Sequence, residues 1–242
     1  MVTPTEELKA AARAAGADLV GVADLAPFKR ERTTLPPDLL DPYTRAAAVA
    51  LHLEDAVIDG IQTAPTPDYA RHYGAVNAAL DRLTAELVNW LCARRFAARA
   101  IPASQLADEP NLLGSLSHRA VARMAGLGWQ GRSLLIVTPQ YGPRVRLATV
   151  LTDMPLAPDL PLRNRCGGCL KCVRACPATA IKRAAPAERY ERREDVLQVS
   201  RCAETALQFK TRLDLAARVC GVCVSVCPFG KRRGQNRIAR GK

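Results

Sequence analysis

Eight of the nine cysteines lie in the last third of the chain, at spacings that favour metal-cluster chemistry. The first four form the run Cys166-x2-Cys169-x2-Cys172-x3-Cys176-Pro177. In such a run, three closely spaced thiolates bind one [4Fe–4S] cube, while the cysteine before the proline reaches a second cube. The spacing therefore predicts an iron–sulfur centre in this part of the chain.

A second, incomplete copy of the run follows as Cys220-x2-Cys223-x3-Cys227-Pro228. It lacks one cysteine, and Cys202, 18 residues before Cys220, can supply it. Four and four ligands make two [4Fe–4S] clusters. With the last cysteine of each run crossing over, the first cluster is expected on Cys166, Cys169, Cys172 and Cys227. The second is expected on Cys176, Cys202, Cys220 and Cys223.

Disulfide bonds and structural zinc are two other uses of such cysteines, and both are disfavoured here. Disulfides require an oxidising compartment, which nothing in the sequence indicates. Structural zinc uses paired CxxC knuckles, whereas this tight run places its sulfurs around a compact cube better than around a tetrahedral ion. The ninth cysteine, Cys92, stands beside Leu91 on a predicted helix, and we expect a buried thiol there rather than a ligand.

Composition gives the broad class of the protein. Its 242 residues are 48% apolar and 24% charged, which suits a globular core and excludes disordered and fibrous classes. No apolar run approaches the roughly 20 residues of a membrane span. The first residues lack the basic-then-apolar layout of a secretory signal. We therefore expect a cytoplasmic protein that makes no membrane contact.

Charge divides the chain where the cysteines do. Residues 1–160 hold 16 Lys or Arg and 17 Asp or Glu, whereas residues 161–242 hold 19 and 6. Three prolines, at 155, 158 and 161, mark a stiff linker between these parts. We predict a domain over 1–160, a cluster domain over 161–230 and a basic tail over 231–242. The positive charge favours reduced clusters and an acidic or nucleic-acid partner, although a merely solvated surface is the alternative.

The elements that must position these residues follow from periodicity and capping. A capping box at Thr3–Glu6 begins an Ala-rich helix that ends near Gly16. Apolar residues spaced four and three apart predict a long helix, at Tyr69, Tyr73, Val76, Leu80, Leu83, Leu87 and Trp90. A second helix is expected over 115–125 and a loop over 24–43. Strands are expected over 18–23, 45–53, 97–101, 133–138 and 145–151.

Residues 126–131 read Gly-Leu-Gly-Trp-Gln-Gly and match the dinucleotide fingerprint letter for letter. That fingerprint follows a strand and opens a helix, whereas here a predicted helix precedes the glycines and a predicted strand follows them. A nicotinamide site is therefore disfavoured. We expect a glycine C-cap and a tight turn into a central strand. Glycines in such a turn can also let the backbone approach a flat ligand.

The sequence resembles the cobalamin-dependent epoxyqueuosine reductases and, more distantly, the reductive dehalogenases. The resemblance spans residues 1–230 and rests on the turn 125–131 with Leu134-Leu135-Ile136, on Leu151-Thr152-Asp153, and on the cysteine set with Arg201-Cys202. It implies an α+β fold, in which a nitroreductase-like α/β domain holds base-off cobalamin and precedes a ferredoxin-like domain with two [4Fe–4S] clusters. In that family the clusters pass single electrons to cobalt.

The resemblance also implies site residues. Cobalamin contacts are expected from Gly126, Gly128, Trp129 and Gly131, with Trp129 either stacking on the corrin edge or packing in the turn. The family's aspartate proton donor falls at about Leu112, near Asp108 and Asn111. Its Glu-Arg pair is His118-Arg119 here, and its Gly-Lys-Asn is Gly131-Arg132-Ser133. His118 is the candidate proton donor, since histidine can donate near neutral pH, and a structural histidine is the alternative.

These features predict a short, divergent iron–sulfur oxidoreductase of this family. We expect it to receive electrons from a ferredoxin or flavodoxin and to pass them to cobalamin for reductive chemistry. One alternative is an electron-transfer or activator protein that reduces a separate corrinoid protein. The other is an epoxyqueuosine reductase proper, acting on tRNA through its basic surface.

Overall fold

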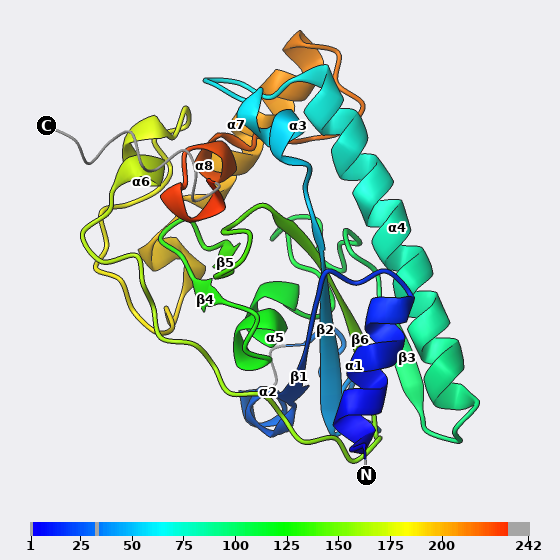
Figure 1. Ribbon diagram of the computed structural model, residues 1–242. Coiled ribbons are helices and arrows are strands. Elements are labelled where there is room, and N and C mark those ends of the chain that lie inside the picture. The colour runs from blue at the N-terminus through cyan, green and yellow to red at the C-terminus, as the bar shows by residue number, and fades with distance from the viewer. Residues whose placement is uncertain (1, 32–33, 232–242) are drawn as a thin grey trace, which may run out of the picture. The chain divides into compact units, whose positions relative to one another are not determined.

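The structure is a computed structural model that describes residues 2–31 and 34–231 (Figure 1). Except for Lys231, the predicted basic tail lies outside the described residues. The chain divides into two compact units. We call the first, made of 1–51, 75–128 and 146–162, the sheet unit. We call the second, made of 52–74, 129–145 and 163–242, the cysteine unit. The domain boundaries expected from charge remain a prediction.

A four-stranded sheet has the order β1-β2-β6-β3. Its strands are β1 (Leu19–Asp24), β2 (Arg45–His52), β3 (Ala98–Ile101) and β6 (Val145–Thr152). β1 pairs with β2, and β3 with β6, in antiparallel register. The inner strands are the more buried, because small and β-branched residues fill both of their faces. Antiparallel pairing with flanking helices confirms the α+β class.

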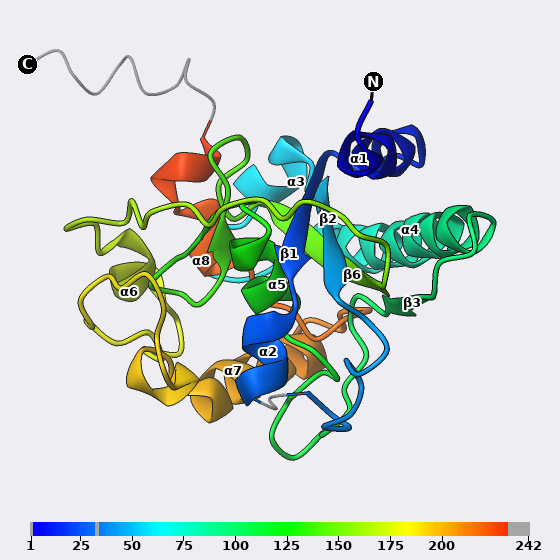
Figure 2. The same cartoon turned by 90° about the horizontal axis from the view of Figure 1, so that it is seen from below.

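Three helices lie wholly or mostly in the sheet unit, and two of them begin at a capping side chain. In α1 (Pro4–Ala14), Thr3 is the N-cap and both bonds of the capping box form with Glu6. α4 (Pro67–Cys92) carries the predicted stripe, with Leu80 and Leu87 almost fully buried. α5 (His118–Met124) is capped by Ser117. α1 and α5 both contact β1, and they lie on opposite sides of it in Figures 1 and 2.

Several expectations were wrong in detail. The predicted loop over 24–43 contains α2 (Ala26–Glu31), and residues after β2 form the unexpected helix α3 (Asp55–Asp59). The strand expected over 133–138 shrinks to β5 (Ile136–Val137), which pairs with β4 (Trp129–Gln130) in a separate two-stranded sheet. The turn at Leu134, where φ is +60°, breaks the apolar run before it can extend. The glycine turn therefore does not lead into a central strand.

The cysteine unit carries short helices around a small core. These helices are α6 (Lys171–Ala175), α7 (Val199–Arg212) and α8 (Val222–Ser225), with 3-10 turns at Arg193–Asp195 and Pro228–Gly230. Its core consists of Leu134, Ala180, Ile181, Val196 and Leu197. Four cysteines pack against this core, namely Cys172, Cys176, Cys202 and Cys223. Within the described residues, no helix combines the length and apolarity needed to cross a membrane.

Candidate iron–sulfur centre

The eight predicted ligands are all partly buried residues of the cysteine unit. Cys172 lies on α6, Cys202 on α7 and Cys223 on α8, and α6 contacts α8. The turn before α8 requires glycine, because Gly221 has φ of +78°. A Cβ there would stand 2.7 Å from side-chain atoms of both Ile61 and Tyr69. The segment that contains Ile61 and Tyr69 therefore packs tightly against the backbone of the second cysteine run.

The thiols of the first run have Cys227 as a neighbour. The pKa of the Cys227 thiol is raised to about 11, mainly by burial; the backbone N–H of Phe229 lowers it, and Cys166, Cys172 and Cys169 add to the increase. Burial also raises the pKa of Cys172, with Cys166 and Cys169 adding to the effect. The C-terminal cysteine therefore lies among the first three, although more than 50 residues separate it from them.

The thiols of Cys176, Cys202, Cys220 and Cys223 also interact electrostatically with one another. Burial raises the pKa of Cys220, and Cys202 and Cys176 raise it further. The pKa of Cys223 is well above its usual value, mainly through burial and then through Cys220, Cys202, Cys172 and Cys176. Buried thiols of this kind ionise readily only when a metal binds the thiolate. The donor chemistry therefore suits a cationic iron–sulfur core bound by the thiolates of each group.

Backbone and side-chain bonds fix the start of the first run. The Asn164 side chain donates to the carbonyls of Gln130 and Ala187, at 2.8 Å each, and its Oδ1 accepts the N–H of Cys166 at 2.9 Å. The N–H of Ala180 points at the sulfur of Cys176 at 3.4 Å. In the described part of the chain, no group of three or more His, Cys, Asp or Glu is spaced to hold a single metal ion.

The glycine turn begins as a helix cap, as predicted. Gly126 has φ of +68°, its N–H bonds to the carbonyl of Arg123, and the N–H of Leu127 bonds to the carbonyl of Ala122. These bonds satisfy the last carbonyls of α5. A Cβ on Gly126 would lie 2.7 Å from the carbonyl oxygen of Leu160. The chain's own backbone therefore occupies the space beside this glycine.

The other residues of the turn are also enclosed by protein. Trp129 is 1% exposed and meets Phe229 edge to face, with ring centroids 4.9 Å apart. A Cβ on Gly131 would stand 2.8 Å from Val137 and 3.8 Å from the sulfur of Cys166. Gly128 is buried as well. Trp129 thus packs in the turn with no ring face open, and the expected cobalamin contacts of these residues rest on the resemblance alone.

His118 is the first residue of α5, and both of its ring nitrogens are engaged. Nε2 lies 3.0 Å from the carbonyl of Pro102, so it carries the proton and donates. Nδ1 lies 2.8 Å from Thr149 Oγ1 and accepts from that hydroxyl. Burial lowers the pKa of His118, which favours the neutral ring. This geometry supports the structural alternative, and proton donation stays a prediction.

The loop at the family's proton-donor position has a fixed local structure. Asn111 donates from its backbone N–H to Asp108 Oδ1 at 3.0 Å and from its side chain to Asp108 Oδ2 at 2.7 Å. Leu112 then takes a φ of +54°. The Asp108 carboxylate is therefore held as a turn acceptor.

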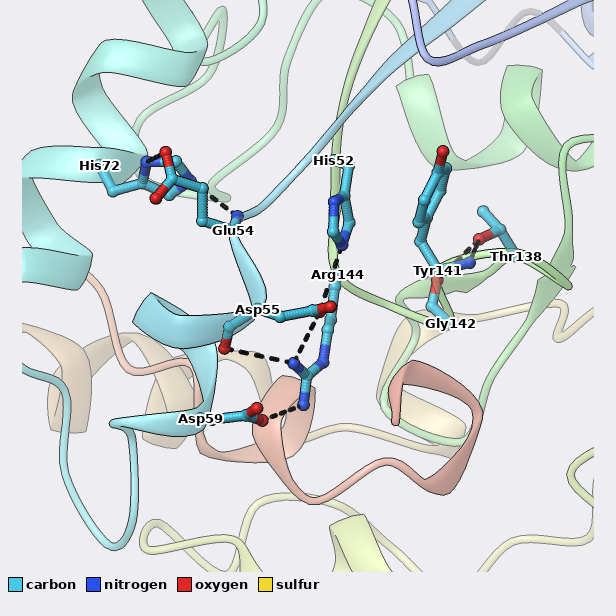
Figure 3. Close-up of polar contacts among 9 residues, drawn as sticks. All are labelled: His52, Glu54, Asp55, Asp59, His72, Thr138, Tyr141, Gly142 and Arg144. Atoms are coloured by element: carbon cyan, nitrogen blue, oxygen red, sulfur yellow. Dashed lines mark hydrogen bonds and ion pairs between the residues drawn. The ribbon is translucent and has the colours of Figure 1, made fainter. Parts of the chain in front are cut away.

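An ion-pair network that no sequence pattern predicts surrounds Arg144 (Figure 3). The guanidinium is 1% exposed and reaches Asp55 at 2.9 Å and Asp59 at 2.5 Å, both on α3. His52 lies 3.4 Å from Asp55 and stacks on Tyr141, so it joins the network. The sequence does not predict this network, because α3 has no strong local signal and its two aspartates are more than 80 residues from Arg144.

Cys92 also departs from expectation, because its thiol is exposed. The buried stripe of α4 continues from Leu87 to Leu91, which leaves the next residue turned away from the core at the end of the helix.

Residues 165–230 match the family model described as a 4Fe-4S double cluster binding domain. The chain is 36% identical over 126 residues to the epoxyqueuosine reductase of Bacillus subtilis, covering 49% of this chain and 30% of that protein. It is 31% identical over 268 aligned positions to the tetrachloroethene reductive dehalogenase of Sulfurospirillum multivorans, covering 94% and 50%. The chain thus spans half or less of the length of these relatives.

Solved structures share the fold. A reductive dehalogenase structure, reported with a mechanism for B12-dependent dehalogenation, aligns with a TM-score of 0.73 at 21% identity, covering 99% of this chain and 34% of the other. A selenomethionine-labelled epoxyqueuosine reductase aligns with a TM-score of 0.62 at 23% identity, covering 93% and 65%.

Proposed function

Because this chain is a relative of the epoxyqueuosine reductases and the reductive dehalogenases, we propose that it is an iron–sulfur oxidoreductase with two [4Fe–4S] clusters and with cobalamin as the electron acceptor. In this proposal a ferredoxin or flavodoxin supplies single electrons. Low-valent cobalt, when bound, supplies the reducing power for removing a leaving group from a substrate. The substrate itself is left open by the proposal.

The observation that carries the proposal is the division of the thiols into two neighbourhoods. Cys227 interacts with the first run, and Cys176 interacts with Cys220 and Cys223, while Cys172 also acts on Cys223, so the two groups adjoin. This is the crossover that two-cluster ferredoxin motifs require. We therefore assign Cys166, Cys169, Cys172 and Cys227 to the first cluster. The second cluster takes Cys176, Cys202, Cys220 and Cys223.

The chain's own residues keep these ligands in place and partly shielded from water. Asn164 orients the backbone at Cys166, and Gly221 lets the second run approach Tyr69. The partial burial of the thiols lowers the local dielectric around each cluster. A low dielectric and fixed hydrogen bonds to sulfur are two of the features that set a cluster's reduction potential.

The side chains of the glycine turn are enclosed by protein, because Trp129 is buried and a Cβ on Gly126 or Gly131 would meet other atoms. The cobalamin contacts of Gly126, Gly128, Trp129 and Gly131 stay a prediction from the resemblance. This enclosure favours the second candidate function, in which the chain transfers electrons to a separate corrinoid protein.

The test is anaerobic reconstitution followed by titration with cob(II)alamin and electron paramagnetic resonance. About eight irons and eight sulfides per chain are expected for two cubes. A base-off cobalt signal would support the chain as the cobalamin protein. An unchanged signal of free cobalamin beside intact clusters would favour the electron-transfer function. Fewer than about five irons per chain would overturn both.

A further inference from the structure

Arg132 is a buried cation without an acidic partner. Its side chain is among the few charged groups of the core, with 6% exposure. In the described residues it forms no ion pair, and its Nε is buried without any hydrogen-bond partner. Burying an unpaired guanidinium is costly unless a negative charge lies close by. Among the described residues no carboxylate lies within ion-pair distance of Arg132, so a bound anionic group would resolve the cost.

The bonds of Arg132 lead to the first cysteine run. One terminal nitrogen donates to the carbonyl of Gly167 at 2.8 Å, and the other donates to the carbonyl of Ala184. Gly167 is the residue directly after Cys166, and a Cβ on Gly131 would lie 3.8 Å from the Cys166 sulfur. The guanidinium therefore braces the loop between two ligands of the proposed first cluster.

A [4Fe–4S] cube with four thiolates is the kind of anion that this site lacks. It carries a charge of about −2 when oxidised and about −3 when reduced by one electron. A fixed cation nearby stabilises the more negative, reduced form more strongly, which raises the reduction potential. The electron comes from the proposed ferredoxin or flavodoxin, and no proton or bond changes place.

We infer that Arg132 is the fixed counter-charge and the positioning residue of the cluster held by Cys166, Cys169, Cys172 and Cys227. This inference rests on the proposed two-cluster function. Arg144 illustrates the contrast, because it is also buried, with an Nε that likewise has no hydrogen-bond partner, but its charge is neutralised by two carboxylates of α3. The two buried arginines therefore serve different purposes: Arg144 stabilises packing, and Arg132 sets the potential of one cluster.

The test compares the wild-type full chain with Arg132→Met, Arg132→Lys and Arg165→Met, all reconstituted anaerobically. Arg165→Met is the matched control, because it removes a charge next to Cys166 from an exposed position. Iron content is measured first, and each cluster's midpoint potential is then measured by paramagnetic resonance during a redox titration.

We expect Arg132→Met to lower the reduced-to-oxidised ratio of one cluster about tenfold at a fixed potential, which is about 59 mV for one electron. The other cluster should be unmoved. Arg132→Lys, which keeps the charge, should stay close to wild type, and Arg165→Met should change the ratio less than about threefold because water screens it.

Two results would overturn the inference. One is Arg132→Met with about eight irons and both potentials unchanged. The other is loss of the first cluster from both Arg132→Met and Arg132→Lys, because the lysine variant keeps the positive charge. If only Arg132→Met loses the first cluster and Arg132→Lys retains it, the counter-charge role is supported. A wild-type chain that holds well under eight irons would instead refute the two-cluster proposal on which the inference rests.

Discussion

Cys202 is the ligand that neither cysteine run contains, so it gives the sharpest test of the assignment at the scale of single residues. It lies on α7 and interacts with Cys220 and Cys223. We expect Cys202→Ala to lose one cube, reducing iron from about eight to about four per chain. Cys92→Ala is the matched control, since it removes an exposed thiol of the sheet unit that belongs to neither run. Retention of all iron in Cys202→Ala would refute the assignment.

His118 makes stability depend on pH. Burial lowers its folded-state pKa below the ordinary 6.5, and Arg146 and Arg119 lower it further, whereas the hydrogen bond to the Pro102 carbonyl and the charge of Asp81 oppose them. The unfolded chain therefore binds the proton more readily. Stability should be undiminished above about pH 6.5 and should fall as the pH drops from there toward the folded-state pKa.

The measurement is the melting temperature of wild type and His118→Gln between about pH 5.5 and 8. Gln keeps a donor and an acceptor but cannot take up the proton. We expect the variant to lose part of the acid-side decrease. Parallel pH profiles for the two proteins would show that His118 does not titrate on unfolding.

At the scale of elements, we expect substitution by alanine to have opposite effects on stability at two glycines, Gly126 in the cap of α5 and Gly74 inside α4. Gly126→Ala places a Cβ at a φ of +68° and 2.7 Å from the carbonyl of Leu160, so we expect a loss of about 1–3 kcal/mol. Gly74→Ala lies within α4 with no atom within 4 Å of the new Cβ, and we expect a gain of about 0.5–1 kcal/mol. Thermal unfolding measures both. Equal stabilities of the two variants would contradict the role of the cap.

The attachment of α3 through Arg144 depends more on one carboxylate than on the other. The Asp55 side chain is 21% exposed and also meets His52, whereas the Asp59 side chain is 46% exposed. We expect Asp55→Asn to cost about 1–3 kcal/mol, and Asp59→Asn less than about 1 kcal/mol because water screens it. Comparison of their melting temperatures tests this order, and the reverse order would refute it.

Elements with strong local signals could be predicted from the sequence. The capping box of α1 and the apolar stripe of α4 depend on residues within a few turns, so their bounds agree closely with expectation. The helix α3 has only five residues and no cap bond to indicate it. The run 133–138 was apolar enough for a central strand, but periodicity cannot show that a turn at Leu134 divides it.

The same distinction separates the parts of the candidate site. The cysteine runs are local patterns, and the comparison with known domains agrees with the two-cluster prediction over 165–230. Arg132 bonds to residues 35 and 52 positions away, which no spacing rule can reveal. The resemblance aligns Arg132 with the lysine of the family's Gly-Lys-Asn, so a cation at this position could be predicted but its contacts could not.

At the scale of the whole molecule, positive charge is concentrated where the clusters are proposed. Residues 163–231 contain 14 Lys or Arg against 6 Asp or Glu. The two basic residues of α6, Lys171 and Arg174, are exposed on either side of Cys172. An acidic electron carrier would be steered to this surface at low ionic strength.

We therefore expect the rate of cluster reduction by a reduced ferredoxin or flavodoxin to fall steeply with added salt, since the Debye length shrinks from about 10 Å at 0.1 M to about 3 Å at 1 M. The double variant Lys171→Glu with Arg174→Glu should reduce this rate at least about tenfold at low salt. Lys210→Glu with Arg212→Glu, at the end of α7, makes the same charge change away from the first run and should have a smaller effect. Equal effects of the two pairs would place the docking surface elsewhere.

The same variants test the tRNA-directed alternative. Salt-dependent binding of tRNA that is lost only in the double variant of Lys171 and Arg174 would favour it, because phosphate contacts would then use the same cations.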